Sequence, residues 1–515
     1  MTCLSMKTQI PQTFPLRVAA IDVGSNALRM LAAEFSDASH YAVLAAERYP
    51  LRLGHDVFLT GKMSGEAVRA AVECLRNFAG TIKGLGIGLT RAVATSAVRE
   101  SKNAEELIFK LRDEVGISLE KISGYEEARL VYLAVRNRVS LGKGQWVLTD
   151  LGGGSVEVSL ADEKGILLSE SHNMGSVRLL EEFAGTADDP GRFKKLLEEY
   201  VATLRVPSAI AGKRPAGFIA TGGNIESLLT LAGAGVRDET GTLPLHDLRS
   251  IIERLAVLSY AERVKQLGLR ADRADVILPA ALVFERLASL LGVEEIVVPR
   301  VGLREGVVCD LVDGLALHED LWDRQIHETA ASLGRKYLFD EPHALHVSRL
   351  ALSLFDQLRK VHRLGKADRR LLMAAGILHD VGAFVSLKGH HKHSLYVISQ
   401  SELPGFSPEE MRLIANVARY HRKSTPSSPH PCYAMLSSAD QARVCKLASI
   451  LRLADALDRE HLQKVVDAAI AVNEGEARIT VRGSGDLLLE RWALRKKSQF
   501  FAEYFGLKVG FKVKR

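Results

Sequence analysis

One pattern constrains the fold of this chain more than any other: a buried strand that ends in an aspartate and a glycine-containing turn, found twice. An apolar strand at residues 17–21 leads into the first copy, Asp22-Val-Gly24-Ser25-Asn26. A strand at residues 145–149 leads into the second copy, Asp150-Leu-Gly152-Gly153-Gly154-Ser155, and a strand at 156–160 follows it. The two aspartates are 128 positions apart (150 − 22), so the repeat predicts two related α/β halves that face one another.

The segments around these turns extend the prediction. A helix from about Ala27 and strands near residues 42–49 are expected to follow the first turn. Later, an apolar strand at 217–220 leads into a third glycine turn, which is expected to open a helix: Thr221-Gly222-Gly223-Asn224.

The chain changes character at about Leu321. Apolar residues then recur with the helical period in four segments of a histidine-rich region, at 343–361, 367–379, 408–420 and 441–457. After Asp467, alternating runs at 469–472, 477–481, 487–489 and 507–513 predict short strands. We therefore expect a flexible arm (1–15), α/β half I (16–140), α/β half II (141–318), an all-helical domain (319–467) and a small basic α+β domain (468–515).

Composition excludes several classes of protein. Apolar residues make up 47% and charged residues 25% of the chain, the balance of a soluble globular protein. The longest apolar runs are far too short to span a membrane, and the N-terminal residues lack the apolar core of a signal peptide. The five cysteines are scattered without metal-binding spacing. These features predict a cytoplasmic protein without a membrane span.

The charge pattern indicates an anionic partner. The net charge is only +6, yet residues 491–515 contain eight Lys/Arg and one acid. Aromatic residues are only 6% of the chain, which leaves little material for stacking nucleic-acid bases. Phosphate chains or nucleotides therefore fit better than nucleic acid.

The two aspartate turns carry phosphate and metal chemistry. A glycine lets a phosphate approach the backbone N–H groups, and a helix start behind the turn adds partial positive charge. A carboxylate in the same cleft can hold the Mg²⁺ that neutralises the phosphate. Asp150 and Glu157, seven residues later on the next strand, are the candidate Mg²⁺ ligands. Either turn alone is weak evidence for a phosphate site, since a simple tight turn between strands has the same sequence pattern. Together with the third glycine turn, the two turns favour a phosphate site.

Several motifs together resemble the exopolyphosphatase/guanosine-pentaphosphate phosphohydrolase family. These are the two aspartate turns, Val93-Ala-Thr-Ser-Ala-Val-Arg99-Glu, Ser123-Gly-Tyr-Glu-Glu127-Ala-Arg-Leu, Met174-Gly-Ser-Val-Arg178-Leu, Ala220-Thr-Gly-Gly and Gly302-Leu-Arg304-Glu-Gly. The resemblance implies two actin-like (ribonuclease H-like) halves around a cleft. It also implies Mg²⁺-dependent removal of terminal phosphate from inorganic polyphosphate and, in some members, from guanosine pentaphosphate.

The resemblance also assigns roles to residues. Glu127 matches the general base, and Arg99 matches a phosphate-contacting arginine. Arg273 resembles a second anion contact, although a surface ion pair with Asp272 or Asp275 is an equal alternative. The phosphate-binding set is Asp22, Gly24, Ser25, Asn26, Gly152, Gly153, Gly154, Ser155, Gly222 and Arg273. Two positions depart from many members: Ala27 replaces a serine, and Asn224 replaces a threonine in a turn that contacts nucleotide elsewhere in the superfamily.

Glu127 lies in the first turn of a predicted helix, residues 126–139. Neighbouring helical residues point about 100° apart, so Glu126 and Glu127 cannot both face the cleft. The helix N-terminus favours the charged form of a carboxylate, which can then accept a proton from water. The alternative is that both acids only cap the helix.

The helical region has a signal of its own. His346, the pair His379-Asp380 and Asp455 follow the order of HD-type phosphohydrolases, which bind a divalent metal through four such groups. Each is embedded in an apolar segment, where metal ligation or a hydrogen-bond network would satisfy it. His390, His391, His393 and His421 add further ligands or phosphate contacts.

We therefore predict a processive exopolyphosphatase that uses Mg²⁺ and water activated by Glu127, with inorganic polyphosphate as its partner and substrate. The alternatives are hydrolysis of guanosine pentaphosphate, an HD-type phosphohydrolase and a non-catalytic polyphosphate or alarmone sensor. We also expect stimulation by K⁺, a homodimer, and a path for long substrate chains along the basic end, at Arg495, Lys496, Lys497, Lys508, Lys512, Lys514 and Arg515.

Overall fold

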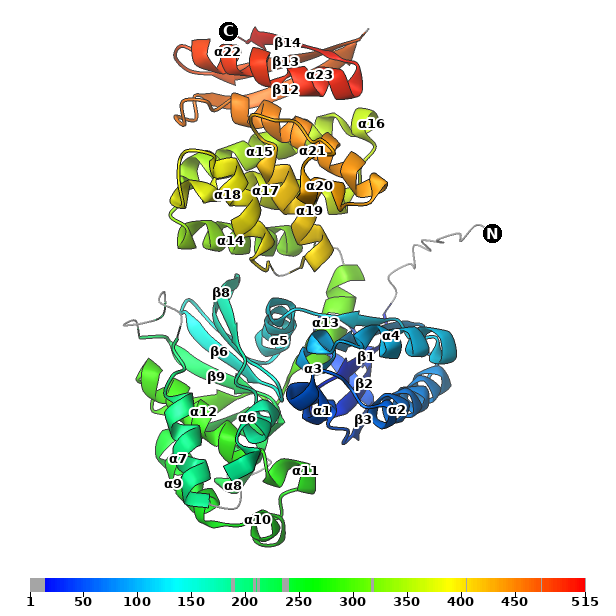
Figure 1. The fold of residues 1–515 in the computed structure, drawn as a ribbon, viewed down its shortest axis with the longest axis vertical. Coiled ribbons are helices and arrows are strands. Elements are labelled where there is room, and N and C mark those ends of the chain that lie inside the picture. The colour runs from blue at the N-terminus through cyan, green and yellow to red at the C-terminus, as the bar shows by residue number, and fades with distance from the viewer. Residues whose placement is uncertain are drawn as a thin grey trace. The chain divides into compact units, whose positions relative to one another are not determined.

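A computed structural model describes residues 14–186, 190–206, 210, 214–233, 240–315, 319–403, 405–473 and 475–514. The chain divides into two compact units, Met1–Asp320 and Leu321–Arg515, which are drawn in Figure 1. Residues 1–13 of the predicted N-terminal arm lie outside the described residues.

The first sheet of the α/β unit contains the first aspartate turn. Its strand order is β3-β2-β1-β4-β5, with β2 and β3 antiparallel to their neighbours and β4 and β5 parallel to β1. The strands are β1 (Leu16–Val23), β2 (Leu28–Phe35), β3 (Tyr41–Tyr49), β4 (Leu89–Ala94) and β5 (Leu119–Lys121).

The second sheet repeats this arrangement. Its order is β10-β11-β9-β6-β7-β8, in which β6 takes the place of β1, β7 and β8 are antiparallel, and β9 and β11 are parallel. The strands are β6 (Trp146–Leu151), β7 (Val156–Asp162), β8 (Gly165–His172), β9 (Gly217–Thr221), β10 (Gly241–Pro244) and β11 (Glu295–Val298). The prediction of two related α/β halves is confirmed.

One element of the first half differs from the prediction. The segment after Ser25 and Asn26 is not a helix but strand β2, which pairs with β1 along its whole length. Its sequence, LRMLAAEF, has a high intrinsic helix propensity, but almost every residue is buried between layers, and tertiary packing overrides propensity. The first aspartate turn is therefore a hairpin turn without a helix start behind it.

Two helices lie between the sheets. Apolar residues of α5 (Gly124–Arg138) and α13 (Leu303–Leu315) share one buried cluster with the facing sides of both sheets (Figure 1). They cross closely at Gly306, where a Cβ atom would lie 1.9 Å from the carbonyl oxygen of Leu130. Only glycine permits this approach, so Gly306 fixes α5, and with it Glu127, against the sheets.

Further helices cover the outer faces. The outer side of the first sheet packs in one cluster with α1 (Leu53–Thr60), α2 (Gly65–Gly84), α3 (Ser96–Glu100) and α4 (Ala104–Lys110). The outer side of the second sheet packs with α6 (Ser176–Glu182), α7 (Pro190–Val201), α8 (Gly223–Leu231), α9 (Leu245–Val257) and α12 (Ile277–Leu291). The short α10 (Tyr260–Leu267) and α11 (Ala271–Ala274) lie before α12 in the chain.

The second unit is mainly helical, as the period predicts. Its longer helices are α14 (Glu319–Lys336), α15 (Glu341–Gln357), α17 (Lys366–Leu378), α18 (His390–Ser399), α19 (Pro408–Arg419) and α21 (Ser438–Ala456). The connections contain α16 (Arg359–His362), a short 3₁₀ turn at Val381–Phe384 and α20 (Pro431–Ala434).

A three-stranded sheet and two helices complete this unit. The sheet order is β12-β13-β14, with strands Val465–Asn473, Glu476–Gly483 and Lys508–Val513, and the helices are α22 (Leu488–Lys497) and α23 (Gln499–Phe505). The predicted strand at 487–489 is wrong, because Leu488 begins α22. Apolar residues of the sheet and of α15, α17 and α21 belong to one continuous cluster, so the two predicted C-terminal regions share a core.

None of the helices in the described part of the chain is long and apolar enough to cross a membrane.

Candidate active site in the α/β unit

The two aspartate turns meet between the halves of the α/β unit. A Cβ atom on Gly153 would lie 2.9 Å from Cβ of Ser25, and one on Gly154 would lie 2.3 Å from Oγ of Ser96. The glycines therefore allow the backbone of one half to contact the other.

A cavity of about 70 Å³ lies between the turns. Ten of the predicted site residues line it: Asp22, Gly24, Ser25, Asn26, Glu127, Asp150, Gly152, Gly153, Gly222 and Arg273. Arg99, Gly154, Ser155 and Glu157 are not among the lining residues.

Two predicted phosphate contacts use their side chains in other ways. The hydroxyl of Ser25 lies 2.9 Å from that of Ser96 and accepts a hydrogen bond from the backbone N–H of Ala97. The amide of Asn26 donates to the carbonyl of Asp272 and accepts from Arg52. The Asn26 side chain thus joins the two halves, whereas the Ser25 side chain is held within half I. Backbone N–H groups are left as the turn's candidate phosphate donors.

Three buried carboxylates converge beside the cavity. Glu127 comes from the start of α5, Asp150 from the end of β6 and Glu157 from β7, directly opposite Asp150 in the antiparallel register. One oxygen from each lies within 4.8 Å of the others. Asp150 accepts a hydrogen bond of 2.6 Å from Thr221, and Glu157 one of 2.8 Å from Ser171.

Hydrogen bonds satisfy this cluster only in part. The Oε2 atoms of Glu127 and Glu157 are buried without a hydrogen-bond partner. Burial, reinforced by the charge of Glu157, holds the pKa of Glu127 well above its usual range. Burial and the neighbouring Asp150 raise the pKa of Glu157 to about 7. Three buried oxygen ligands of this kind fit a divalent cation such as Mg²⁺, which would relieve their mutual repulsion.

The predicted division of labour between Glu126 and Glu127 is confirmed. Ser123 caps α5 by accepting from the backbone N–H of Glu126. The Glu126 carboxylate turns away and accepts hydrogen bonds from Arg91 and Arg129. Glu127 is left to face the cavity.

Two arginines supply positive charge. Nη1 of Arg99 donates to the carbonyl of Ile122 and lies 3.7 Å from Oε2 of Glu127, so this side chain adjoins the proposed base. Arg273 is buried and donates to the side chain of Asn224 at 2.5 Å. The alternative of a surface ion pair is wrong for Arg273, because Asp272 pairs with Arg48 and Asp275 with Arg52.

Burial lowers the pKa of Arg273 to about 9, and its Nε atom has no partner. A buried guanidinium in this state favours an anion in the cavity.

Sequence reasoning missed Arg29 and Thr221. Nη1 of Arg29 lies 3.5 Å from Oδ2 of Asp22, and the two residues pair across β1 and β2. The signal was present in the repeat, because Arg29 follows Asp22 by seven residues, as Glu157 follows Asp150.

The predicted metal set of the helical unit needs one correction. His343, not His346, joins His379 and Asp380, and Asp455 lies beside it. Residues three apart on a helix differ by about 60° in direction, and His346 turns to accept a hydrogen bond from Arg349 instead.

The basic end also differs from the predicted path. Lys496 and Lys497 line a pocket of the helical unit, and Lys497 pairs with the buried Asp455. Lys508 and Lys512 of β14 are exposed, as a surface path would require.

The fold and the site together define an enzyme that acts on phosphate groups. The features that do so are the two paired α/β halves, the two aspartate turns that meet between them and the buried acid cluster. Comparison with known proteins identifies the family. Residues 34–315 match the Ppx/GppA phosphatase family, and residues 326–498 match Ppx/GppA phosphatase, domain III. The chain belongs to the Ppx/GppA phosphatase family, whose members are hydrolases of phosphoanhydride bonds.

Individual relatives agree with this assignment. The chain is 28% identical over 442 residues to a guanosine-5'-triphosphate,3'-diphosphate pyrophosphatase of Aeromonas hydrophila, which covers 85% of this chain and 86% of that protein. The structure of an exopolyphosphatase from Cytophaga hutchinsonii is 27% identical, with a TM-score of 0.55, over 58% of this chain and 98% of that one. The structure of an exopolyphosphatase-like protein is 26% identical, with a TM-score of 0.51, over 57% and 97% of the two chains. The chain shares the actin-like α/β fold of these structures.

Proposed function

We propose that this protein is an exopolyphosphatase that removes the terminal phosphate of inorganic polyphosphate, with Glu127 as the general base. The observation that carries this function is the buried Oε2 atom of Glu127, which accepts no hydrogen bond, beside a cavity lined by both aspartate turns and Arg273. Water that attacks the terminal phosphorus would give its proton to this oxygen and release orthophosphate, leaving the chain one unit shorter.

Each surrounding group has a role in this reaction. Backbone N–H groups of the two turns and the Arg273 guanidinium would bind oxygens of the terminal phosphate. Arg99 would hold the Glu127 carboxylate in place from its position 3.7 Å away. Asp150 and Glu157 would hold Mg²⁺, which supplies neutralisation of phosphate charge when bound.

The third glycine turn favours an inorganic chain over a nucleoside in the cavity. A Cβ atom on Gly223 would lie 2.6 Å from Nη2 of Arg273, and the same guanidinium binds Asn224. The arginine thus fills the space over this turn, which favours a compact phosphate group over a nucleobase at this place.

Guanosine pentaphosphate is the second candidate substrate. The relative from Aeromonas hydrophila, which is similar over 85% of the chain, is named for activity on this compound. Its terminal phosphate could enter the same cavity while the guanosine stays outside, so both substrates would share one chemical step.

One comparison tests the proposal. Phosphate release would be measured from long-chain polyphosphate and from guanosine pentaphosphate, side by side, with Mg²⁺ and with a chelator. We expect Mg²⁺-dependent release that is faster from polyphosphate. Faster release from guanosine pentaphosphate would transfer the assignment to the second candidate, and release from neither would refute the proposed function.

A further inference from the structure

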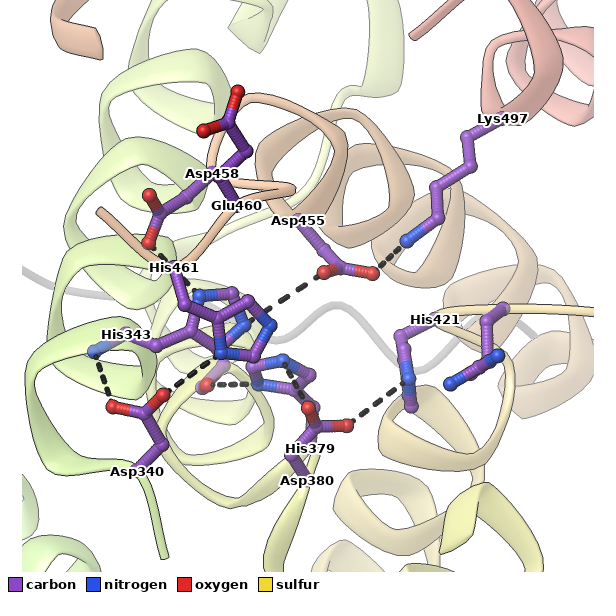
Figure 2. Close-up of polar contacts among 12 residues, drawn as sticks. Asp340, His343, His379, Asp380, His421, Asp455, Asp458, Glu460, His461 and Lys497 are labelled. Atoms are coloured by element: carbon purple, nitrogen blue, oxygen red, sulfur yellow. Dashed lines mark hydrogen bonds and ion pairs between the residues drawn. The ribbon is translucent and has the colours of Figure 1, made fainter. Parts of the chain in front are cut away.

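The helical unit contains a second cluster of ligating groups, separate from the acid cluster of the α/β unit. His343 comes from α15, His379 and Asp380 follow α17, and Asp455 comes from α21 (Figure 2). Both histidine side chains are completely buried. One ligand atom each of His343, His379 and Asp380 lies within 4.8 Å of the others, and Oδ1 of Asp455 is 3.8 Å from Nε2 of His343.

Hydrogen bonds fix which ring nitrogen of each histidine faces this cluster. Nδ1 of His343 donates to Asp458 at 2.9 Å, and Nδ1 of His379 donates to the carbonyl of Gly376 at 2.7 Å. In a neutral ring the other nitrogen, Nε2, then carries a lone pair. Both Nε2 atoms are buried without a hydrogen-bond partner.

The carboxylate of Asp455 is held in the same manner. Lys497 donates to Oδ2 of Asp455 and leaves Oδ1 toward His343. Oδ2 of Asp380 lies 3.7 Å from Nε2 of His379. Asp458, the Gly376 carbonyl and Lys497 thus bind one side of His343, His379 and Asp455 and aim the other side inward, as the outer shell of a metal centre usually does.

From this geometry we propose that the helical unit holds a divalent transition-metal ion between His343, His379, Asp380 and Asp455, and that this ion binds a phosphorylated ligand from the pocket beside it. Ligand atoms around such an ion lie about 3 to 4 Å apart, so the cluster is nearly assembled. Two imidazole nitrogens favour Mn²⁺, Fe²⁺, Co²⁺ or Zn²⁺ over Mg²⁺. Without an ion, the lone pairs of two histidines would face two carboxylates with nothing between them.

The adjacent pocket indicates which class of ligand the ion would bind. It has a volume of about 600 Å³, and Asp380 and Asp455 lie at its wall, which is enough room for a nucleotide or a short phosphate chain. Six cations line it: Arg422, Lys423, Arg452, Arg459, Lys496 and Lys497.

Most of this positive charge is not neutralised by the protein. Among the six cations only Lys497 has a carboxylate partner within the described residues. Arg422 donates to the ring of His390, and Arg452 donates to backbone carbonyls. A pocket in which most of the cations lack a carboxylate partner is complementary to phosphate groups.

Trp492 also lines the pocket and is 58% exposed. An exposed indole could stack on a nucleobase. The phosphate chemistry thus has two possible sources, an inorganic phosphate chain or a nucleotide, which the experiment below separates.

The first part of the test concerns the metal. The full chain with Asp150→Asn, which weakens the acid cluster, would be loaded with one equivalent of Mn²⁺ and studied by pulsed electron paramagnetic resonance. We expect bound Mn²⁺ with ¹⁴N modulation from imidazole ligands. Adding Asp380→Asn, or the milder Asp455→Asn, should abolish that modulation, whereas His430→Gln, a histidine outside the cluster, should not.

Circular dichroism of each variant would check that the fold is retained. Absence of ¹⁴N-coupled Mn²⁺ in the Asp150→Asn protein, or its persistence in a folded Asp380→Asn variant, would overturn the metal site.

The second part concerns the ligand. In the Asp150→Asn protein, added tripolyphosphate or GTP should produce ³¹P coupling on the nitrogen-ligated Mn²⁺. Arg459→Glu with Lys496→Glu should keep the ¹⁴N modulation but lower the apparent affinity for the phosphate probe at least tenfold. Coupling with both probes would identify phosphate recognition alone, and coupling with GTP alone would add a base contact at Trp492. No ³¹P coupling with either probe, or equal affinity in the charge-reversed variant, would overturn the ligand site.

Discussion

The two halves of the α/β unit carry the same turn but opposite charges across from its aspartate. In half I, Asp22 pairs across the sheet with Arg29; in half II, Asp150 pairs with Glu157. The first pair is an ion pair at 3.5 Å, whereas neither Asp150 nor Glu157 has an ion-pair partner among the described residues.

The two halves therefore have the same backbone arrangement but a different charge beside the aspartate. Half I places a cation beside its aspartate, whereas half II places a second carboxylate there, whose charge a cation from solution can neutralise. Glu127, from α5 of half I, lies beside these two carboxylates and completes the cluster. In the proposed mechanism, both halves therefore supply a phosphate-binding turn, and the two Mg²⁺ ligands come from half II only.

The largest effect is expected from Glu127→Gln. The variant keeps the shape of the side chain but removes its basicity, so kcat should fall by about 10² to 10⁴ while substrate still binds. Steady-state kinetics and equilibrium binding of polyphosphate would measure the two quantities.

Glu126→Gln is the matched control for this change. Glu126 faces Arg91 and Arg129 rather than the cavity, so its loss should lower thermal stability and leave kcat within a few-fold of wild type. Wild-type turnover in Glu127→Gln would remove Glu127 from its assigned role.

A second prediction compares the equivalent aspartates. Asp150→Asn should raise the Mg²⁺ concentration needed for half-maximal activity by about 10- to 100-fold, because it removes a ligand. Asp22→Asn should change that concentration much less, since Arg29 already balances Asp22. Mg²⁺ titrations of both variants would measure this, and equal shifts would show that the halves do not differ as described.

Features of the fold and the site that depend on residues close together in the sequence could be predicted, whereas features that depend on distant residues could not. The aspartate turns and the position of Glu127 on its helix follow from local spacing, so both could be predicted. The strand β2 could not, because its Leu, Met and Ala residues favour a helix until pairing with β1 and β3 is considered. His343 and His346 lie on the same helix, and either one fits the residue order of an HD-type metal site. Only packing decides which of the two side chains turns inward. Arg273 was ambiguous because its neighbours Asp272 and Asp275 find their partners far away in the sequence.

A third prediction uses the pKa of Glu157, which is 4.5 ordinarily and about 7 in the folded protein. Below pH 4.5 the group is protonated in both states. As pH rises toward 7, the unfolded chain releases its proton first, so ionisation favours unfolding and the folded state loses stability. In chelator at pH 8, Glu157→Gln should therefore be more stable than wild type by on the order of 1 to 3 kcal/mol, with no such gain at pH 4.5.

Urea unfolding at the two pH values would measure this difference. Arg29→Gln, which removes the compensating charge of half I, should instead destabilise the protein at pH 8. A Glu157→Gln variant that is less stable than wild type at pH 8 would contradict the claim that ionised Glu157 destabilises the folded protein.

The smallest effect is expected at the basic end of the chain. Lys508 and Lys512 are exposed and have no ion-pair partner among the described residues, whereas Lys497 is neutralised by Asp455. If the exposed lysines bind distal phosphates, Lys508→Glu with Lys512→Glu should slow hydrolysis of long polyphosphate a few-fold and flatten its salt dependence. Tripolyphosphate should be unaffected, and equal slowing of both substrates would argue against a chain-binding path.

The asymmetry between the halves can be tested most directly by diffraction from crystals soaked in Mn²⁺, with anomalous differences measured near the two turns of the α/β unit. We predict a peak in contact with Asp150 and Glu157 and none beside Asp22 and Arg29. A peak beside Asp22, or no peak at the acid cluster of half II, would contradict the account.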